Sequence, residues 1–291
     1  MERGRLLISY AHPDDESFGL GAAIPKWIDD GIDVYLICAT NGEVGMVPEA
    51  LQGKYATTAE LRLSELDCAR QHLKFKEVFM LGYRDSGMPG SETSRHPDSL
   101  CYQWRNRPTD VTAKVKDILR RAKPHVVVTF NRYGGYGHPD HIAIQRATTQ
   151  AFDELRASAS GDADKGAYQP QKLYYAAFPK VTIRLGILRA RLRGQDPRRM
   201  GRNQDVDVVK TLEHSEPVHA RIPVARYFDV WERASSCHAS QGGGRISRTS
   251  RWLRRVLYSK QGFTRIYPAP ERDRVDEVDL FANVDLNSRT K

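Results

Sequence analysis

The sequence predicts a Rossmann-like α/β fold: a mainly parallel sheet flanked by helices. Short apolar runs rich in β-branched and aromatic residues alternate with segments of helical periodicity, which is the pattern of βαβ units. The chain has 291 residues, of which 40% are hydrophobic and 28% charged, enough to bury a sizeable core. We expect a single domain over residues 1–291, with a basic insertion at 184–208 and residues 213–291 completing the domain.

Five segments have the composition of strands. They are Leu6–Tyr10, Val34–Cys38, Val78–Leu81, Val126–Phe130 and Leu173–Ala177. Each is short and apolar, and helical patterns lie between them, so we expect the five to pair in one sheet.

The first clear helix begins at a capping box, in which Thr57 is followed three residues later by Glu60. The apolar spacing that follows predicts a helix as far as Leu73. A second helix is expected over Val111–Ala122, ended by Pro124, because a proline disfavours helical backbone in the residue before it.

A third helix is predicted to begin within the sequence around His138, which places His141 in its first turn. Its apolar face carries Ile142, Ile144, Ala147 and Phe152. Ala157–Gln171 is rich in Ser, Gly, Asp and Ala without apolar periodicity, so a loop is expected there.

The formal charge of +9 is concentrated locally, since seven arginines lie between Arg184 and Arg202. This stretch is either an amphipathic basic helix that meets a membrane or an acidic ligand, or a solvated helical insertion, and we favour the insertion. Nucleic-acid binding is not expected, because aromatic residues are not interleaved with the basic ones. No run approaches the roughly 18 apolar residues of a membrane span, and a cytoplasmic protein is expected.

The four cysteines are far apart in the sequence. Cys38, Cys68, Cys101 and Cys237 show neither Cys-x-x-Cys spacing nor the density of a disulfide framework. We expect reduced, mostly buried thiols that do not bind metal.

Two histidine-aspartate motifs follow predicted strands. Residues 11–16 read AHPDDE, directly after the first strand, and residues 138–141 read HPDH, after the fourth. If these strands are parallel neighbours, both motifs lie at the edge where open α/β sheets bind ligands.

Histidine and carboxylate groups suit zinc and similar divalent ions, and a catalytic site commonly uses three protein ligands and an open position for water. The expected ligands are His12, Asp15 and His141. Asp14 and Asp15 are adjacent, so one can bind metal while the other faces the water as a base. An aspartate at a helix start is often only an N-cap, but two such motifs after two strands favour a metal site.

No Gly-x-Ser-x-Gly elbow, P-loop or His-Glu-x-x-His motif is present, which disfavours serine hydrolases, P-loop enzymes and zincins. The two motifs, together with GYRDSGM at 82–88 and YGGYG at 133–137, resemble the PIG-L/LmbE-like de-N-acetylases. The resemblance spans nearly the whole chain except 184–202. It implies a Zn²⁺-dependent enzyme that removes acetyl groups from N-acetylglucosaminyl conjugates.

By position, the resemblance implies zinc bound by His12, Asp15 and His141. It also implies Asp14 as general base and His138 near the reacting carbonyl. Fe²⁺ would suit the same three ligands.

Four further residues have candidate roles. Asp140 either orients the imidazole of His138 or caps a helix. Tyr136, on a glycine-flanked loop, either swings over the substrate or is a surface aromatic. Arg84 and Asp85 either bind sugar hydroxyls or form a surface pair.

Glu16 is expected to face the following helix or to stabilise its N-terminus rather than to bind metal. His238 is expected to have a structural role. The favoured function is a de-N-acetylase acting on a small amino-sugar conjugate. The alternatives are a catalytically silent sugar-binding protein on the same fold and an amidase acting on a thiol S-conjugate. An oligomer is possible.

Overall fold

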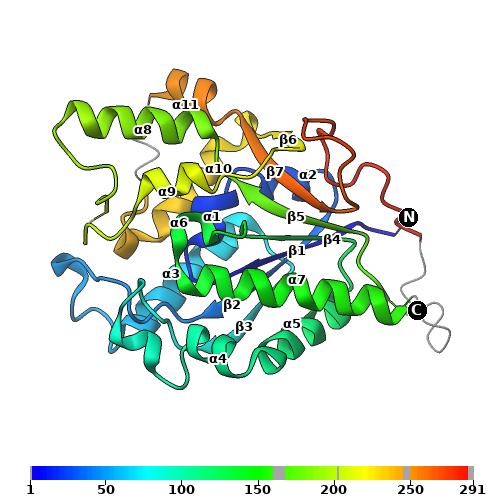
Figure 1. Ribbon diagram of the computed structural model, residues 1–291, viewed down its shortest axis with the longest axis horizontal. Coiled ribbons are helices and arrows are strands. Elements are labelled where there is room, and N and C mark those ends of the chain that lie inside the picture. Colours follow the sequence, from blue (N-terminus) through cyan, green and yellow to red (C-terminus); the bar gives the residue numbers. More distant parts are fainter. Residues whose placement is uncertain (1, 160–167, 202, 245–249, 288–291) are drawn as a thin grey trace.

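The computed structural model describes residues 2–159, 168–201, 203–244 and 250–287. Within these ranges the strands form one seven-stranded sheet in the order β3-β2-β1-β4-β5-β7-β6 (Figure 1). The strands are β1 (Arg5–Tyr10), β2 (Asp33–Thr40), β3 (Glu77–Tyr83), β4 (Val126–Thr129), β5 (Lys172–Ala177), β6 (Ala220–Pro223) and β7 (Lys260–Tyr267). The α/β fold expected from the sequence is confirmed.

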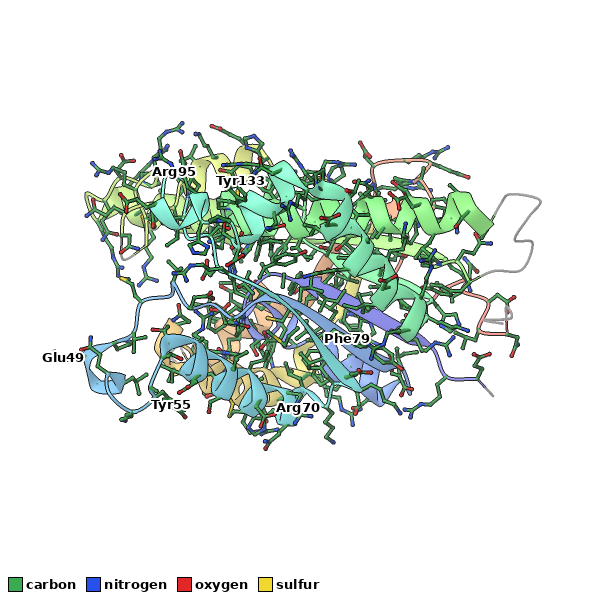
Figure 2. The ribbon with its side chains drawn as sticks, turned by 90° about the horizontal axis from the view of Figure 1, so that it is seen from below. Glu49, Tyr55, Arg70, Phe79, Arg95 and Tyr133 are labelled. Carbon is green, nitrogen blue, oxygen red and sulfur yellow. A yellow bond between two sulfur atoms is a disulfide. The ribbon has the colours of Figure 1, made fainter. Side chains whose placement is uncertain are left out.

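Helices cover both faces of the sheet. They are α1 (Asp15–Leu20), α2 (Ile24–Asp29), α3 (Thr58–Leu73), α4 (Leu100–Asn106), α5 (Pro108–Ala122), α6 (Gly134–Gly137), α7 (Pro139–Ala159), α8 (Lys180–Leu192), α9 (Val208–Glu213), α10 (Phe228–Cys237) and α11 (Arg251–Tyr258). Helix α5 packs on α7, and α3 packs on α10. Figure 2 shows α3, marked by Arg70, on the opposite side of the sheet from α5.

The five predicted strands correspond to β1–β5, and all their pairings are parallel. The central strand β1 pairs on one side with β2 and on the other with β4, with Leu6 opposite both Val34 and Val126. The strand order therefore reverses between β1 and β4. Their carboxyl ends lie side by side, which is where ligands bind in open α/β sheets.

Strands β6 and β7 were not predicted. Strand β7 pairs antiparallel with both β5 and β6, so the C-terminal part of the chain extends the same sheet. Only Phe263 and Thr264 of β7 are buried, and β6 has four residues of alternating burial. Neither strand has the continuous apolar run that identified the other five.

The predicted helix boundaries are largely confirmed. The Thr57 side chain accepts a hydrogen bond from the Glu60 amide (3.1 Å), as a capping box requires. The Glu60 side chain accepts from the amide of Ala56 (3.1 Å), the residue before the N-cap, in place of the N-cap amide itself. Helix α5 begins at Pro108, three residues earlier than expected. Helix α7 continues to Ala159, into the segment expected to be a loop, and residues 160–167 of that segment lie outside the described residues.

The prediction of four reduced cysteines is wrong for one pair. Cys68 and Cys237 form a disulfide, while Cys38 and Cys101 are free and buried, as expected. The bonded cysteines are 169 residues apart in the sequence. Because α3 and α10 pack against each other, the two Cα atoms come within 5.7 Å.

Replacing both bonded cysteines, Cys68→Ser/Cys237→Ser, is expected to lower the free energy of unfolding by about 2–4 kcal/mol, because the crosslink restricts the unfolded chain. Urea unfolding without reductant measures the change. Adding reductant should destabilise the wild-type protein and leave the variant unchanged. Equal unfolding midpoints for wild type and variant would show that the bond does not stabilise the fold.

The arginine-rich stretch begins in a helix, as predicted. Helix α8 carries Arg184, Arg189 and Arg191, and the chain then leads through 193–207 to α9. In the described parts of the chain, every helix is too short or too polar to cross a membrane.

Candidate metal centre and active-site cavity

The chain makes a tight turn as it leaves β1. His12 is buried, and its backbone amide donates to Asp15 Oδ2 at 2.7 Å. Asp14 has a φ of 133°, which a residue with a side chain rarely adopts. This turn directs the Asp14 and Asp15 side chains differently, as expected for two adjacent carboxylates with separate roles.

Three side chains from the two motifs converge at the carboxyl ends of the strands. His12 Nδ1 lies 3.2 Å from His141 Nε2 and 3.4 Å from Asp15 Oδ2. His141 Nε2 lies 3.3 Å from Asp15 Oδ1. Ligands about 2.0–2.1 Å from a tetrahedral zinc ion are separated from one another by about 3.4 Å. The spacing of the three predicted ligands therefore fits a zinc-sized ion.

The other nitrogen of each imidazole has its own partner. His141 Nδ1 lies 3.1 Å from the Gly134 carbonyl oxygen, and His12 Nε2 lies 3.3 Å from Asp140 Oδ2. Such partners orient metal-binding histidines and leave the opposite nitrogen to the metal. Gly134 has a φ of 69°, and a Cβ there would lie 2.8 Å from Ile142 Cγ1, so glycine is required in this turn.

The carboxylate of Asp140 contacts the imidazole of His12, whereas the roles expected from the sequence were to orient His138 or to cap a helix. It is fully buried and accepts hydrogen bonds from the amide (2.8 Å) and hydroxyl of Ser86, which follows β3. The first turn of α7 directs it toward β1 and β3. The contact with His138 comes from the backbone instead, since the Asp140 amide donates to His138 Nδ1 at 3.2 Å.

Asp14 forms an ion pair that the sequence analysis did not foresee. Its Oδ2 lies 3.2 Å from Arg62 on α3, and the same guanidinium donates to the carbonyls of Pro13 and Gly42. Burial raises the pKa of Asp14 to about 6, although Arg62 acts to lower it. A carboxylate that titrates near neutrality is suited to accept and return a proton.

Glu16 and His238 hold the turn that presents Asp14. Glu16 Oε2 accepts from the Asp14 amide (3.0 Å), and Glu16 Oε1 lies 2.8 Å from His238 Nε2. Both side chains are almost fully buried. Glu16 was expected to face the following helix or to stabilise its N-terminus, and its contact with the Asp14 amide, at the N-cap of α1, agrees with the second alternative. The contact with His238, which follows α10 and is 222 residues later in the chain, was not foreseen.

A cavity of about 550 Å³ opens in front of these residues. Of the predicted site residues, His12, Asp14, Asp85, Tyr136 and His138 line it. The remaining lining residues are Val44, Gly45, Met46, Arg62, Gly87, Met88, Pro89, Ser91, Gly201, Asn203, Asp205, Val206 and Gln241. Four of these lining residues, Gly201, Asn203, Asp205 and Val206, belong to the connection between α8 and α9.

Arg84 does not line the cavity, contrary to expectation, whereas its neighbour Asp85 does. Consecutive residues in extended backbone point to opposite sides, so Arg84 and Asp85 cannot both face the same pocket. The arginine that lines the cavity is Arg62 on α3. The signal in the sequence was an arginine among the apolar positions of the predicted helix, next to Leu61. In the structure its side chain is 3% exposed, and arginine is rarely so buried unless it is paired.

A second ligand set is possible from the geometry alone. His138 has a ring nitrogen within 4.8 Å of donor atoms of His12 and His141. Burial lowers the pKa of His138 well below its usual value, and His12 and His141 add to this effect. Burial raises the pKa of the Tyr136 hydroxyl, so this group stays protonated.

Comparison with known proteins identifies similar sequences. The PIG-L family model, described as GlcNAc-PI de-N-acetylase, matches residues 7–152. A 1D-myo-inositol 2-acetamido-2-deoxy-alpha-D-glucopyranoside deacetylase of Acidothermus cellulolyticus is 35% identical, covering 97% of this chain and 95% of the relative. The enzyme of the same name from Thermobifida fusca is 31% identical, covering 97% and 100%.

Solved structures share the fold at lower identity. N,N'-diacetylchitobiose deacetylase from Pyrococcus horikoshii has a TM-score of 0.59 at 19% identity, covering 92% of this chain and 88% of that one. GalB, a 4-carboxy-2-hydroxymuconate hydratase from Pseudomonas putida, has a TM-score of 0.57 at 18% identity, covering 92% and 98%. Because a hydratase shares the fold, the fold alone does not define the reaction.

Proposed function

The chain belongs to the PIG-L family of de-N-acetylases and is an amide-hydrolysing deacetylase, and we propose that its substrate is N-acetylglucosamine linked to myo-inositol. Support for this substrate comes from the two relatives that match nearly the whole chain. We also propose zinc as the metal, with His12, Asp15 and His141 as its ligands.

One observation carries the proposal for the site. At the carboxyl ends of β1 and β4, one nitrogen of His12 and one of His141 lie 3.2 Å apart, and the two oxygens of the Asp15 carboxylate lie 3.4 Å and 3.3 Å from them respectively. His12 and Asp14 line the cavity beside them. The site thus offers two imidazoles, one carboxylate and a second carboxylate as a base. Zinc held there would polarise an acyl carbonyl and lower the pKa of water toward about 7.

Asp14 would accept the proton of the attacking water. Its ion pair with Arg62 and the contact of its amide with Glu16 restrict its position, so the carboxylate stays directed into the cavity. The amine leaves only when it is protonated. Asp14 can return the proton it accepted, with His138 as the other candidate donor.

His138 and Tyr136 would stabilise the negative charge that develops on the carbonyl oxygen. His138 Nδ1 accepts from the Asp140 amide, so a neutral ring carries its proton on Nε2. The Tyr136 hydroxyl would be a second donor, a role supported by the position of the residue in the cavity lining and of its ring 5.1 Å from that of His141. Donors aimed at developing charge account for a large share of many catalytic effects.

The rest of the cavity would bind the hydroxyl groups of the substrate. Asp85 lies near the metal centre, with Oδ1 3.5 Å from His12 Nε2. Asn203, Asp205 and Gln241 supply further polar side chains to the lining. A cavity of about 550 Å³ is within the size range of small-ligand sites.

The test is amine release from a panel of acylated compounds by zinc-loaded and chelator-treated protein. The panel holds the N-acetylglucosaminyl inositol, N-acetylglucosamine, N,N'-diacetylchitobiose and an acetylated thiol S-conjugate. We expect the highest kcat/KM with the inositol conjugate and loss of release after chelation. Parallel loading with Fe²⁺ compares the two metals.

Other results would redirect the proposal. A preference for the S-conjugate would indicate the amidase alternative. Sugar binding without release, in protein that contains stoichiometric metal, would indicate the catalytically silent alternative. Full activity in metal-free protein would contradict the role of the three ligands.

A further inference from the structure

Helix α8 exposes an apolar stripe to solvent. Four aliphatic side chains follow one another at helical spacing: Val181 (60% exposed), Leu185 (48%), Leu188 (53%) and Leu192 (80%). Residues three and four positions apart lie on the same face of a helix. The buried side chains of α8, Ile187 and Ala190, lie at other positions. The helix therefore packs on the domain with one set of residues and presents a separate apolar stripe outward.

Arginines flank this stripe. Arg184, Arg189 and Arg191 are exposed on α8, and Arg193 is exposed directly after it. The ion pairs of the segment are made further along, by Arg198 with Asp207 and Glu213. The outward side of α8 thus combines exposed aliphatic side chains with positive charge.

Helix α11 adds a second apolar patch nearby. Trp252 is 72% exposed and Val256, four residues later, is 61% exposed. The start of α8 and the end of α11 line one cavity of about 300 Å³, which includes Phe178 and Tyr258. Figure 1 shows both helices at the same end of the molecule, at the top of the view.

We propose that this α8–α11 face, defined by the α8 stripe, its flanking arginines, Trp252 and Val256, binds the surface of a bilayer that contains anionic phospholipid. Leucine, valine and tryptophan side chains enter the boundary between headgroups and acyl chains, and guanidinium groups bind headgroup phosphates. The lining of the small cavity includes four aromatic residues, Phe18, Phe178, Trp231 and Tyr258, together with small and aliphatic residues and the polar Thr182, Lys260 and Gln261. This composition suits contact with acyl chains.

Charge distinguishes this partner from a second copy of the chain. Self-association through the α8–α11 face would bring the arginines of two copies together, and like charges at an interface are unfavourable. An anionic bilayer neutralises them. Membrane binding goes beyond the proposed deacetylation and does not depend on it, since none of the face residues named here lines the catalytic cavity.

The test is cosedimentation of the full chain with two kinds of vesicle, phosphatidylcholine alone and phosphatidylcholine mixed with phosphatidylglycerol. We expect binding to the mixed vesicles that weakens as salt is raised. Leu188→Glu/Leu192→Glu should weaken it by about tenfold or more, because two exposed aliphatic anchors are lost. Arg184→Gln/Arg191→Gln should reduce the preference for phosphatidylglycerol. The matched control is Val275→Glu/Val278→Glu, at exposed valines outside the face.

Three outcomes would overturn the proposal. They are absence of binding to the mixed vesicles at low salt, equal loss in the control variant, and a dimer in vesicle-free solution that Leu188→Glu/Leu192→Glu dissociates. The last result would assign the face to a second copy. A blue shift of Trp252 emission on the mixed vesicles, absent in Trp252→Phe, gives an independent readout of the same contact.

Discussion

Asp14→Asn is expected to reduce kcat/KM for amine release by about 10²–10⁴-fold while zinc content stays at the wild-type level. The side chain lies beside the three proposed ligands and is not among them, so the substitution is expected to remove only its ability to accept a proton. Asparagine is the informative replacement, because it matches the shape of aspartate and so disturbs least a position whose φ is 133°. A loss of activity in this variant therefore reports the missing proton acceptor, and not a change in the backbone turn after β1.

The measurements are steady-state amine release and zinc content by mass spectrometry. Asp67→Asn, at an exposed aspartate on α3, is the matched control and should retain full activity. Ordinary turnover in Asp14→Asn would remove Asp14 from the mechanism. Loss of zinc in the same variant would instead make Asp14 a ligand.

His12→Ala and His141→Ala are each expected to weaken zinc binding by more than about 100-fold, since even loss of a residue that only orients a ligand costs 10–100-fold. Activity should fall to background with the metal. His138→Ala is expected to lose activity and keep zinc. These three variants test the proposed ligands against the alternative set of His12, His138 and His141.

Zinc content after dialysis against metal-free buffer gives the result for each variant, and unfolding curves establish that each is folded. Asp15→Ala completes the set. If Asp15→Ala kept zinc and His138→Ala lost it, the ligand set would be the three histidines, and the donor spacing of 3.2–3.4 Å would not identify the site.

Local sequence patterns predicted strands β1–β5 and the start of α3. The central strands are continuous apolar runs, and α3 begins at a capping-box sequence whose two hydrogen bonds form within five residues. Strands β6 and β7 were missed because they are partly exposed and extend the sheet beyond β5 by antiparallel pairing, with β6 as the edge strand. Their strand character depends on the neighbour they pair with, which no local pattern encodes.

The proposed ligand residues could be selected from the sequence because each motif directly follows a strand. Parallel pairing of β1 with β4 then brings His12 and His141 together. The polar contacts around them were less predictable. Asp140 was expected either to orient His138 or to cap a helix, whereas its carboxylate meets His12, since the rotation of the first turn of α7 decides which ring it faces.

By itself, the sequence determined the α/β class, the five parallel strands and the residues that converge at the edge of the sheet. The tertiary structure alone decided which residues from distant segments complete the site. Arg62 on α3 and His238 after α10 reach it only because those two helices pack together, which also joins Cys68 to Cys237. Such contacts depend on how helices far apart in the sequence pack together, and a short sequence motif contains no information about that packing.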